Sequence, residues 1–160
     1  MRKRIALLIL ISAIFGLVFA DLNDAEITVS TAEANVGETV EISVSASELS
    51  ASWNVLSYEF DLAFDPSIVE FVGSDADGTL SEDGIVVVND LESGQISVGF
   101  MATSILSGSG NLLNLQFELI NDGASLLDIS DFWFNDTEIF ALNDGQITDE
   151  AYDEVTITVG

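Results

Sequence analysis

Hydrophobic and polar side chains alternate in short runs along residues 26–159, and Gly, Asn, Asp or Ser interrupts the alternation every eight to twelve residues. Alternation with period two puts successive side chains on opposite faces of an extended strand, and a series of such runs is typical of an all-β sandwich. The strands predicted in this way cover residues 27–30, 38–45, 57–64, 71–72, 85–89, 95–102, 112–120, 126–129 and 155–159. We therefore expect an all-β sandwich of about nine strands.

The third predicted strand separates core from surface most clearly. One set of alternating positions holds large apolar side chains, namely Tyr58, Phe60, Leu62 and Phe64. The other set holds small or acidic side chains, namely Ser57, Glu59, Asp61 and Ala63. We predict that the first set is buried in the core and that the second set forms an open polar surface.

Aromatic residues also cluster at Phe132, Trp133 and Phe134, and a second tryptophan, Trp53, precedes the third strand. A platform for stacking sugars is one interpretation of this cluster. However, three consecutive side chains on a strand cannot share one face. The alternation therefore predicts that Phe132 and Phe134 fill the core and that Trp133 lies at an edge or interface.

The predicted turns contain glycines, at Gly37, Gly78, Gly84, Gly94, Gly123 and Gly145. Glycine adopts a positive φ without steric cost, so we expect left-handed backbone at these positions. The single proline, Pro66, follows Asp65 at the end of the third strand, and residues 66–70 are predicted to form a short helical turn.

The first twenty residues predict secretion. Arg2, Lys3 and Arg4 precede an apolar run at residues 5–19, and Ala20 precedes Asp21. This order is typical of a cleavable signal peptide, and the run is shorter than the roughly 20 residues that span a bilayer. We therefore divide the chain into a signal peptide at residues 1–20 and a domain at residues 21–160, which is secreted or held at the cell surface.

Cleavage after Ala20 would remove every basic residue, because the chain has 3 Lys+Arg, no His and 28 Asp+Glu. The formal charge of the domain would be −28, three units below the −25 of the whole chain. A chain without Lys or Arg cannot neutralise phosphates, which excludes nucleic-acid binding and disfavours anionic membranes. Salt screens the repulsion among carboxylates, so the charge predicts a saline habitat or the presence of divalent cations. The alternative is acidic drift, the ordinary accumulation of acidic residues in a secreted protein.

The composition also limits the chemistry. Without His or Cys there is no imidazole base, no thiolate nucleophile and no zinc site of the usual kind. Residues 75–84 are rich in oxygen ligands, but an EF-hand register puts Gly73 and Gly84 where carboxylates are needed. We read this segment as an acidic hairpin loop rather than a surface calcium site, and predict no metal site, no cofactor and no catalytic residues. With 28 Asp and Glu residues, some pair of carboxylates will always have the separation that glycoside hydrolysis requires. The number of acids therefore does not indicate a glycosidase.

Residues 58–72 (YEFDLAFDPSIVEFV) resemble the third strand and following turn of cohesin domains. Residues 27–30 and 35–44 are similar to the first hairpin of that family, residues 94–100 and 112–119 to its late strands, and residues 154–159 stand where its last strand is expected. The resemblance implies a nine-stranded antiparallel jelly-roll β-sandwich, and a module without enzymatic activity. Such a module binds a calcium-containing dockerin of another secreted protein, often a polysaccharide-degrading enzyme, in a cellulosome-like assembly.

The resemblance also implies a contact surface on the outward side of strands three, five, six and eight. Carried onto this sequence, that surface comprises Ser57, Glu59 and Asp61 of the third strand, Ser97, Gly99 and Met101 of the sixth, and Asn114, Gln116 and Glu118 of the eighth. Gly99 beside Met101 would leave a flat patch with a soft apolar side chain that suits a partner helix. The acids favour a basic partner and an association rate that falls with salt.

Two other classes of function remain open at this point. A carbohydrate-binding module on a related sandwich would bind polysaccharide directly and would expose a coplanar strip of Trp and Tyr. A structural surface or adhesin domain would occur in tandem copies.

Overall fold

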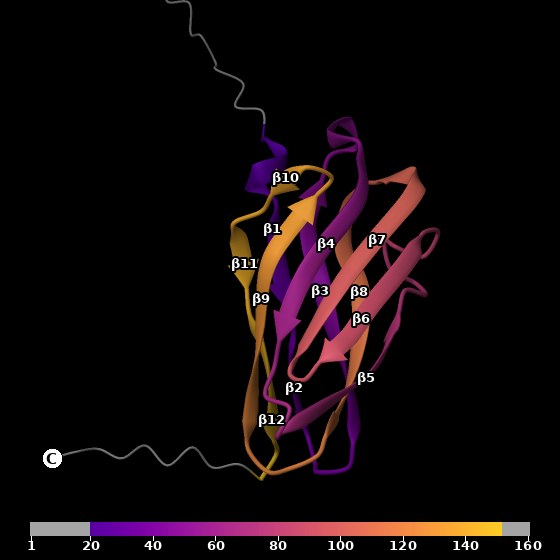
Figure 1. Ribbon diagram of the computed structural model, residues 1–160. Coiled ribbons are helices and arrows are strands. Elements are labelled where there is room, and N and C mark those ends of the chain that lie inside the picture. The colour runs from indigo at the N-terminus through magenta and orange to yellow at the C-terminus, as the bar shows by residue number, and fades with distance from the viewer. Residues whose placement is uncertain (1–19, 152–160) are drawn as a thin grey trace, which may run out of the picture.

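The computed structural model describes residues 20–151 and consists of two β-sheets packed face to face (Figure 1). The predicted β-sandwich is therefore confirmed. One sheet has the strand order β11-β1-β3-β8-β5, and the other has the order β2-β12-β9-β4-β7-β6, with β10 paired to β9. The predicted strand at 155–159 and the predicted signal peptide, except for Ala20, lie outside the described residues.

The predicted number of nine strands is wrong, because the described residues form twelve strands and two short 3₁₀ turns. The 3₁₀ turns are η1 (Leu22–Asp24) and η2 (Ala51–Trp53). The strands are β1 (Glu26–Val29), β2 (Thr31–Ala34), β3 (Thr39–Leu49), β4 (Val55–Ala63), β5 (Val69–Asp75), β6 (Ile85–Glu92), β7 (Gln95–Leu106), β8 (Gly108–Leu119), β9 (Ala124–Phe134), β10 (Thr137–Glu138), β11 (Ala141–Asn143) and β12 (Gly145–Asp149).

The additional strands lie at the two ends of the domain. The first predicted strand corresponds to β1. At Ser30 the chain crosses from one sheet to the other and continues as β2, which was not predicted. After β9, three short strands follow within residues 137–149. The pairs β1–β11 and β2–β12 are parallel, so the prediction of a wholly antiparallel sandwich is also wrong.

The side chains predicted to be buried on the third strand lie in the core or pack against it. Tyr58, Phe60 and Leu62 of β4 are buried, while Phe64, just beyond the strand, is half-buried and packs against the core. Phe132 and Phe134 of β9 are fully buried, as predicted. The Phe60 and Phe132 rings stack with centroids 5.5 Å apart, so the pairing of β4 with β9 also aligns their aromatic side chains.

Glycine has two different roles in the turns. Gly37, Gly78, Gly94 and Gly123 have a positive φ, as predicted, but Gly84 and Gly145 do not. A Cβ atom at Gly145 would overlap the Ser30 carbonyl, and one at Gly84 would overlap the Phe100 ring. Glycine is therefore required at these two positions for close approach rather than for left-handed backbone.

Residues 66–68 form a single hydrogen-bonded turn, so the predicted helical turn is shorter than residues 66–70, and β5 already begins at Val69. The Val69 N–H donates to the Asp65 carbonyl at 3.0 Å and closes this turn. The Asp65 carboxylate accepts hydrogen bonds from the hydroxyl and the backbone N–H of Ser67, and these bonds lower the pKa of Asp65. The Asp-Pro-Ser sequence thus fixes the connection between the two sheets.

One buried hydroxyl makes the stability of the fold sensitive to alkaline pH. The Tyr58 hydroxyl lies 2.9 Å from the Ser81 hydroxyl in the core. Burial raises the pKa of Tyr58 from 10.0 to about 12. The folded state therefore favours neutral tyrosine, and this contribution to stability is fully present below pH 10 and is lost as the pH rises toward 12.

We expect the free energy of unfolding to fall by about 2 to 3 kcal/mol between about pH 9 and pH 12, measured by urea denaturation. Tyr58→Phe should remove most of this pH dependence and should cost about 1 kcal/mol at neutral pH, because Ser81 loses its partner. The absence of Cys leaves few other groups that titrate in this range. The same pH dependence in both proteins would contradict the prediction.

Candidate docking surface

The outer face of β9, β4, β7 and β6 presents side chains in regular rows, because these four strands are neighbours in one sheet. One row crosses β4, β7 and β6 and consists of Ser57, Met101 and Ile85. Two further rows cross all four strands and consist of Trp133, Glu59, Gly99 and Val87, and of Ser130, Asp61, Ser97 and Asn89. We call this face the docking surface.

Six of the nine residues predicted from the sequence lie together on the docking surface. They are Ser57, Glu59 and Asp61 of β4 and Ser97, Gly99 and Met101 of β7. Their inward neighbours on β7, Ile96, Val98 and Phe100, are buried, as the alternation predicts.

The other three predicted residues, Asn114, Gln116 and Glu118, lie on β8. This strand belongs to the five-stranded sheet, where it pairs with β3 and β5, so the structure does not bring these residues to the docking surface. The expectation of one continuous face with all nine residues is wrong. The strand beside β4 is β9, which contains the eighth predicted strand at residues 126–129. The three residues were assigned to the eighth strand, but they lie in the seventh predicted strand at residues 112–120.

Sequence reasoning therefore missed residues on two strands of the docking surface. They are Asp128, Ser130, Asp131 and Trp133 of β9 and Ile85, Val87 and Asn89 of β6. Both Ser130 and Asp131 are exposed, because β9 contains an irregularity where Asp131 has a φ of 50°. This extra residue interrupts the alternation of hydrophobic and polar side chains. The sequence pattern therefore no longer shows which side chains of β9 face outward. The one indication in the sequence was Trp133. The alternation predicts that it lies at an edge or interface, because both of its neighbours are core phenylalanines.

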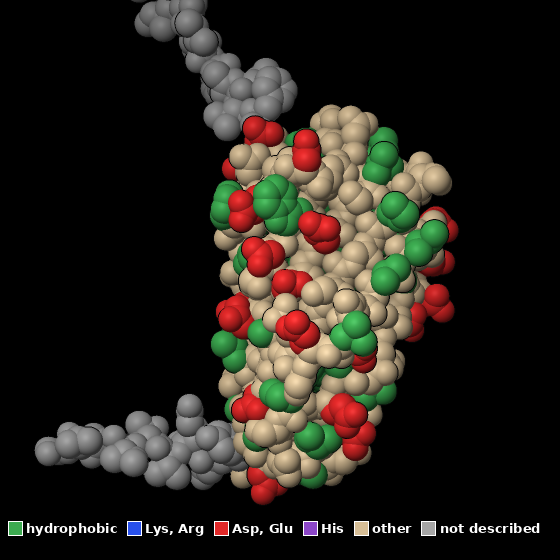
Figure 2. All heavy atoms as spheres, viewed as in Figure 1, with side chains coloured by type: hydrophobic (Ala, Val, Ile, Leu, Met, Phe, Trp, Pro, Cys, Tyr) green, Lys and Arg blue, Asp and Glu red, His purple; other side chains and the backbone are tan. Residues whose placement is uncertain are grey.

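One half of the docking surface is apolar. Ile85, Val87 and Met101 are exposed to 63%, 63% and 61%. They surround Gly99, where an added Cβ atom would meet nothing within 4 Å. Hydrophobic side chains gather over β6 and β7 in Figure 2, on the right of the molecule. A cluster of exposed apolar side chains around an open position is typical of a protein-binding surface.

The other half is acidic. Glu59, Asp61 and Asp131 line a hollow of about 470 Å³ together with the half-buried Trp133. The Ser97 hydroxyl donates a hydrogen bond to the Asp61 carboxylate at 2.5 Å. Residues 20–151 contain no Lys, Arg or His, so no side chain of the described domain neutralises these carboxylates. Their counter-charge has to come from solution or from a partner.

The family assignment follows from a comparison with known domains. The family model of the cohesin domain matches residues 25–159. The chain belongs to the cohesin family. The predicted resemblance is thereby confirmed, and the match covers nearly the whole of the predicted secreted domain.

Solved cohesin structures share the fold of this cohesin. CaCohA2 from Clostridium acetobutylicum has a TM-score of 0.64 and 25% identity, over 78% of this chain and 90% of that chain. The sixth cohesin of scaffoldin B from Acetivibrio cellulolyticus, solved with a mutant Cel5 dockerin, has a TM-score of 0.67 and 22% identity, over 79% and 99%. A non-cellulosomal cohesin from the archaeon Archaeoglobus fulgidus has a TM-score of 0.66 and 19% identity, over 78% and 90%. No curated protein matches this cohesin significantly.

Asn135 fixes the end of β9 against the start of β4. Its side-chain oxygen accepts hydrogen bonds from the N–H groups of Leu56 and Ser57, at 3.0 and 3.2 Å. Its amide group donates to the Asn54 carbonyl at 3.0 Å. These bonds hold Ser57 in its row beside Met101 and so contribute to the shape of the docking surface.

The acidic loop at residues 75–84 uses its carboxylates to hold its own backbone. Asp75 accepts a hydrogen bond from the Asp77 N–H, and Glu82 accepts one from the Gly78 N–H, both at 2.9 Å. Within residues 20–151, no group of three or more acidic side chains is arranged to hold a metal ion. No helix in that range is long and apolar enough to cross a membrane.

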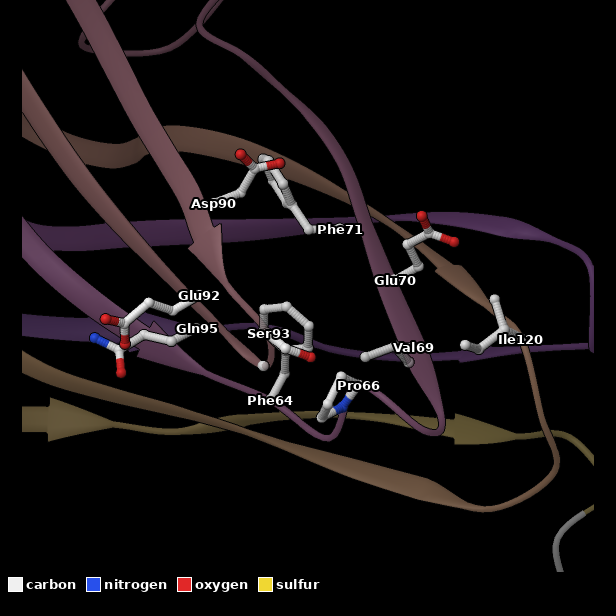
Figure 3. Close-up of a pocket in the computed structure, with 11 residues that line it drawn as sticks. Phe64, Pro66, Val69, Glu70, Phe71, Asp90, Glu92, Ser93, Gln95 and Ile120 are labelled. Carbon is white, nitrogen blue, oxygen red and sulfur yellow. The ribbon is translucent and has the colours of Figure 1, made fainter.

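Another hollow, of about 320 Å³, opens at one edge of this cohesin between β5 and the turn that joins β6 to β7 (Figure 3). Phe64, Val69 and Phe71 form part of its lining, together with the carboxylates of Glu70 and Asp90. None of the predicted site residues lines this hollow.

The tryptophans do not form the strip expected of a carbohydrate-binding module. Tyr58 is buried, and Trp53 packs against the core from η2. Trp133 is half-buried among carboxylates on the docking surface. An extended stacking surface for a sugar chain is therefore not present among these described aromatic residues.

Proposed function

We propose that this cohesin is a non-catalytic module that binds a dockerin-bearing protein through the docking surface. The observation that carries the proposal is the group of three exposed apolar side chains, Ile85, Val87 and Met101, around the open position at Gly99. Burial of such side chains against a partner helix contributes about 25 cal/mol per Å² of apolar surface. The A. cellulolyticus cohesin, with 22% identity and the same fold, was solved with a dockerin, which supports the same class of partner.

The proposed contact residues are Ser57, Glu59, Asp61, Ser97, Gly99 and Met101, together with Ile85, Val87, Asp131 and Trp133, which sequence reasoning missed. The N-terminal residues support a further part of the proposal, which is export by a signal peptide at residues 1–20 and action outside the cell. A polysaccharide-degrading enzyme is the proposed bearer of the dockerin. The A. fulgidus cohesin is non-cellulosomal, so membership of the family does not by itself identify the protein that bears the dockerin. That protein has to be identified by capture.

The test is calorimetric titration of residues 21–160 with each dockerin module encoded in the same genome, with calcium and with chelator at matched ionic strength. We expect at least one dockerin to bind with calcium and to lose binding in chelator, since calcium is expected in the dockerin rather than in this domain. Retention of the domain on insoluble polysaccharide, with no binding of any dockerin, would contradict the proposal. That result would favour a carbohydrate-binding module.

A further inference from the structure

The chain enters the sandwich through a short turn, η1, whose geometry is fixed by hydrogen bonds. Asp21 is the N-cap of η1, and its carboxylate accepts a hydrogen bond from the Leu22 N–H at 3.0 Å. The Asp24 carboxylate accepts a hydrogen bond from the backbone N–H of Asp21 at 2.8 Å. Leu22 is buried in the core, and η1 packs beside β10 at one end of the domain (Figure 1). The backbone nitrogen of Asp21 is therefore held directly against a carboxylate.

Removal of the proposed signal peptide changes the charge of this nitrogen. Hydrolysis of the Ala20–Asp21 peptide bond by a signal peptidase consumes one water, leaves a carboxylate on Ala20 and leaves an amino group on Asp21. Both residues are exposed, so the bond is accessible. An α-amino group is protonated at neutral pH. Residues 21–160, the mature domain, contain no Lys, Arg or His, so this ammonium group is the only cationic group of the mature domain.

We propose that cleavage after Ala20 creates an ion pair between the new α-ammonium group of Asp21 and the Asp24 carboxylate, and that this pair stabilises the mature domain. The inference rests on the export that forms part of the proposed function, and it adds what cleavage does to the fold. In the precursor the nitrogen of Asp21 is a neutral amide, and in the mature domain it is charged. A charged hydrogen bond is about twice as strong as a neutral one. The domain therefore becomes more stable when the signal peptide is removed.

The geometry of the turn makes this pair more effective than most exposed ion pairs. An exposed pair usually contributes little, because two long side chains have to be ordered to form it. Here the ammonium group belongs to the backbone, which is held by a hydrogen bond from the Asp24 N–H to the Asp21 carbonyl at 2.9 Å. Directly after the turn, the Glu26 N–H donates to the Ser47 hydroxyl at 2.9 Å and connects the start of β1 to β3. Only the short Asp24 side chain has to be ordered when the pair forms.

The large negative charge of the domain distinguishes Asp24 from the other acids. The mature domain has 28 acids, so neutralising an exposed acid elsewhere removes repulsion and should raise the melting temperature. Neutralising Asp24 removes repulsion too, but it also removes the partner of the ammonium group. We therefore expect Asp24→Asn to melt about 2 °C below the matched control Asp128→Asn, an exposed acid on β9.

The experiment compares the mature domain with a free α-amino group and the same domain acetylated there, both as wild type and as Asp24→Asn. Because the mature domain lacks Lys, an amine-acetylating reagent finds only one amine. Acetylation keeps an N–H donor at Asp21 and removes the charge. By calorimetry at low salt, we expect acetylation to lower the melting temperature of the wild type by about 2 °C and that of Asp24→Asn by less than half as much. High NaCl should reduce the wild-type difference, because salt screens an exposed pair.

Mass spectrometry of the protein made by its native host supplies the second readout, and Asp21 is expected as the first residue of the exported protein. Equal melting temperatures of the free and acetylated forms, or equal losses in the wild type and Asp24→Asn, would overturn the ion pair and leave export and dockerin binding untouched. A protein that keeps residues 1–20, or an exported protein that begins at a residue other than Asp21, would overturn the inference at the cleavage step. Dockerin binding is measured separately by the calorimetric titration.

Discussion

Met101→Glu is expected to weaken the binding of the cognate dockerin by at least about 100-fold while the domain stays folded. Met101 is 61% exposed and lies between Ser57 and Ile85 in the first row of the docking surface. A glutamate there would be buried in the complex without a counter-charge, and it would stand near Glu59 of the next row. Calorimetric titration of the variant with the dockerin identified by capture measures the effect.

Val72→Glu provides the matched control for this substitution. Val72 lies on β5 in the five-stranded sheet and is 52% exposed, so the same kind of chemical change occurs away from the docking surface. We expect its affinity for the dockerin to stay within about twofold of the wild-type value. Equal losses in both variants would show that added negative charge, rather than the position of Met101, weakens binding.

The melting temperature of residues 21–160 is expected to rise by about 10 °C or more between about 0.05 and 2 M NaCl. The reason is that all 28 acids remain in this part of the chain while all Lys and Arg lie at residues 2–4, so the folded state holds uncompensated like charges close together. Differential scanning calorimetry across a salt series measures this rise.

Sucrose at matched osmolality separates screening from general exclusion of cosolutes, because only salt shortens the range of charge repulsion. Neutralising Glu41, Glu48 and Glu118 should reduce the slope of melting temperature against salt. A melting temperature that stays constant across the NaCl series would contradict the saline interpretation. It would leave acidic drift in a secreted protein as the explanation of the composition.

The sequence predicted burial well, because alternation reports directly which side chains face inward. Tyr58, Phe60 and Leu62 are in the core, and Phe132 and Phe134 are buried on either side of Trp133, as alternation required. The same argument placed Met101 and Glu59 outward. Each of these conclusions depends only on the local strand, so it needs no knowledge of which strands are neighbours.

Strand pairing could not be predicted from the same pattern. Asn114 and Gln116 of β8 alternate with buried leucines as regularly as Glu59 does with its neighbours, yet they belong to the other sheet. Alternation identifies the outer face of a strand but not the sheet to which it belongs. The crossing at Ser30 and the irregularity at Asp131 also escaped prediction, because neither change of backbone direction is accompanied by Gly or Pro.

The parallel pairs at the two ends of the domain bear on when the protein can fold. Thr28 of β1 pairs with Asn143 of β11, 115 residues later, and β2 pairs with β12. A chain exported with its N-terminus first delivers β1 and β2 well before their partners emerge. Loop closure over such a distance is slow, so the first strands remain incompletely paired until export is nearly complete. Under the proposed export, the sandwich would close only after β11 and β12 have crossed the membrane.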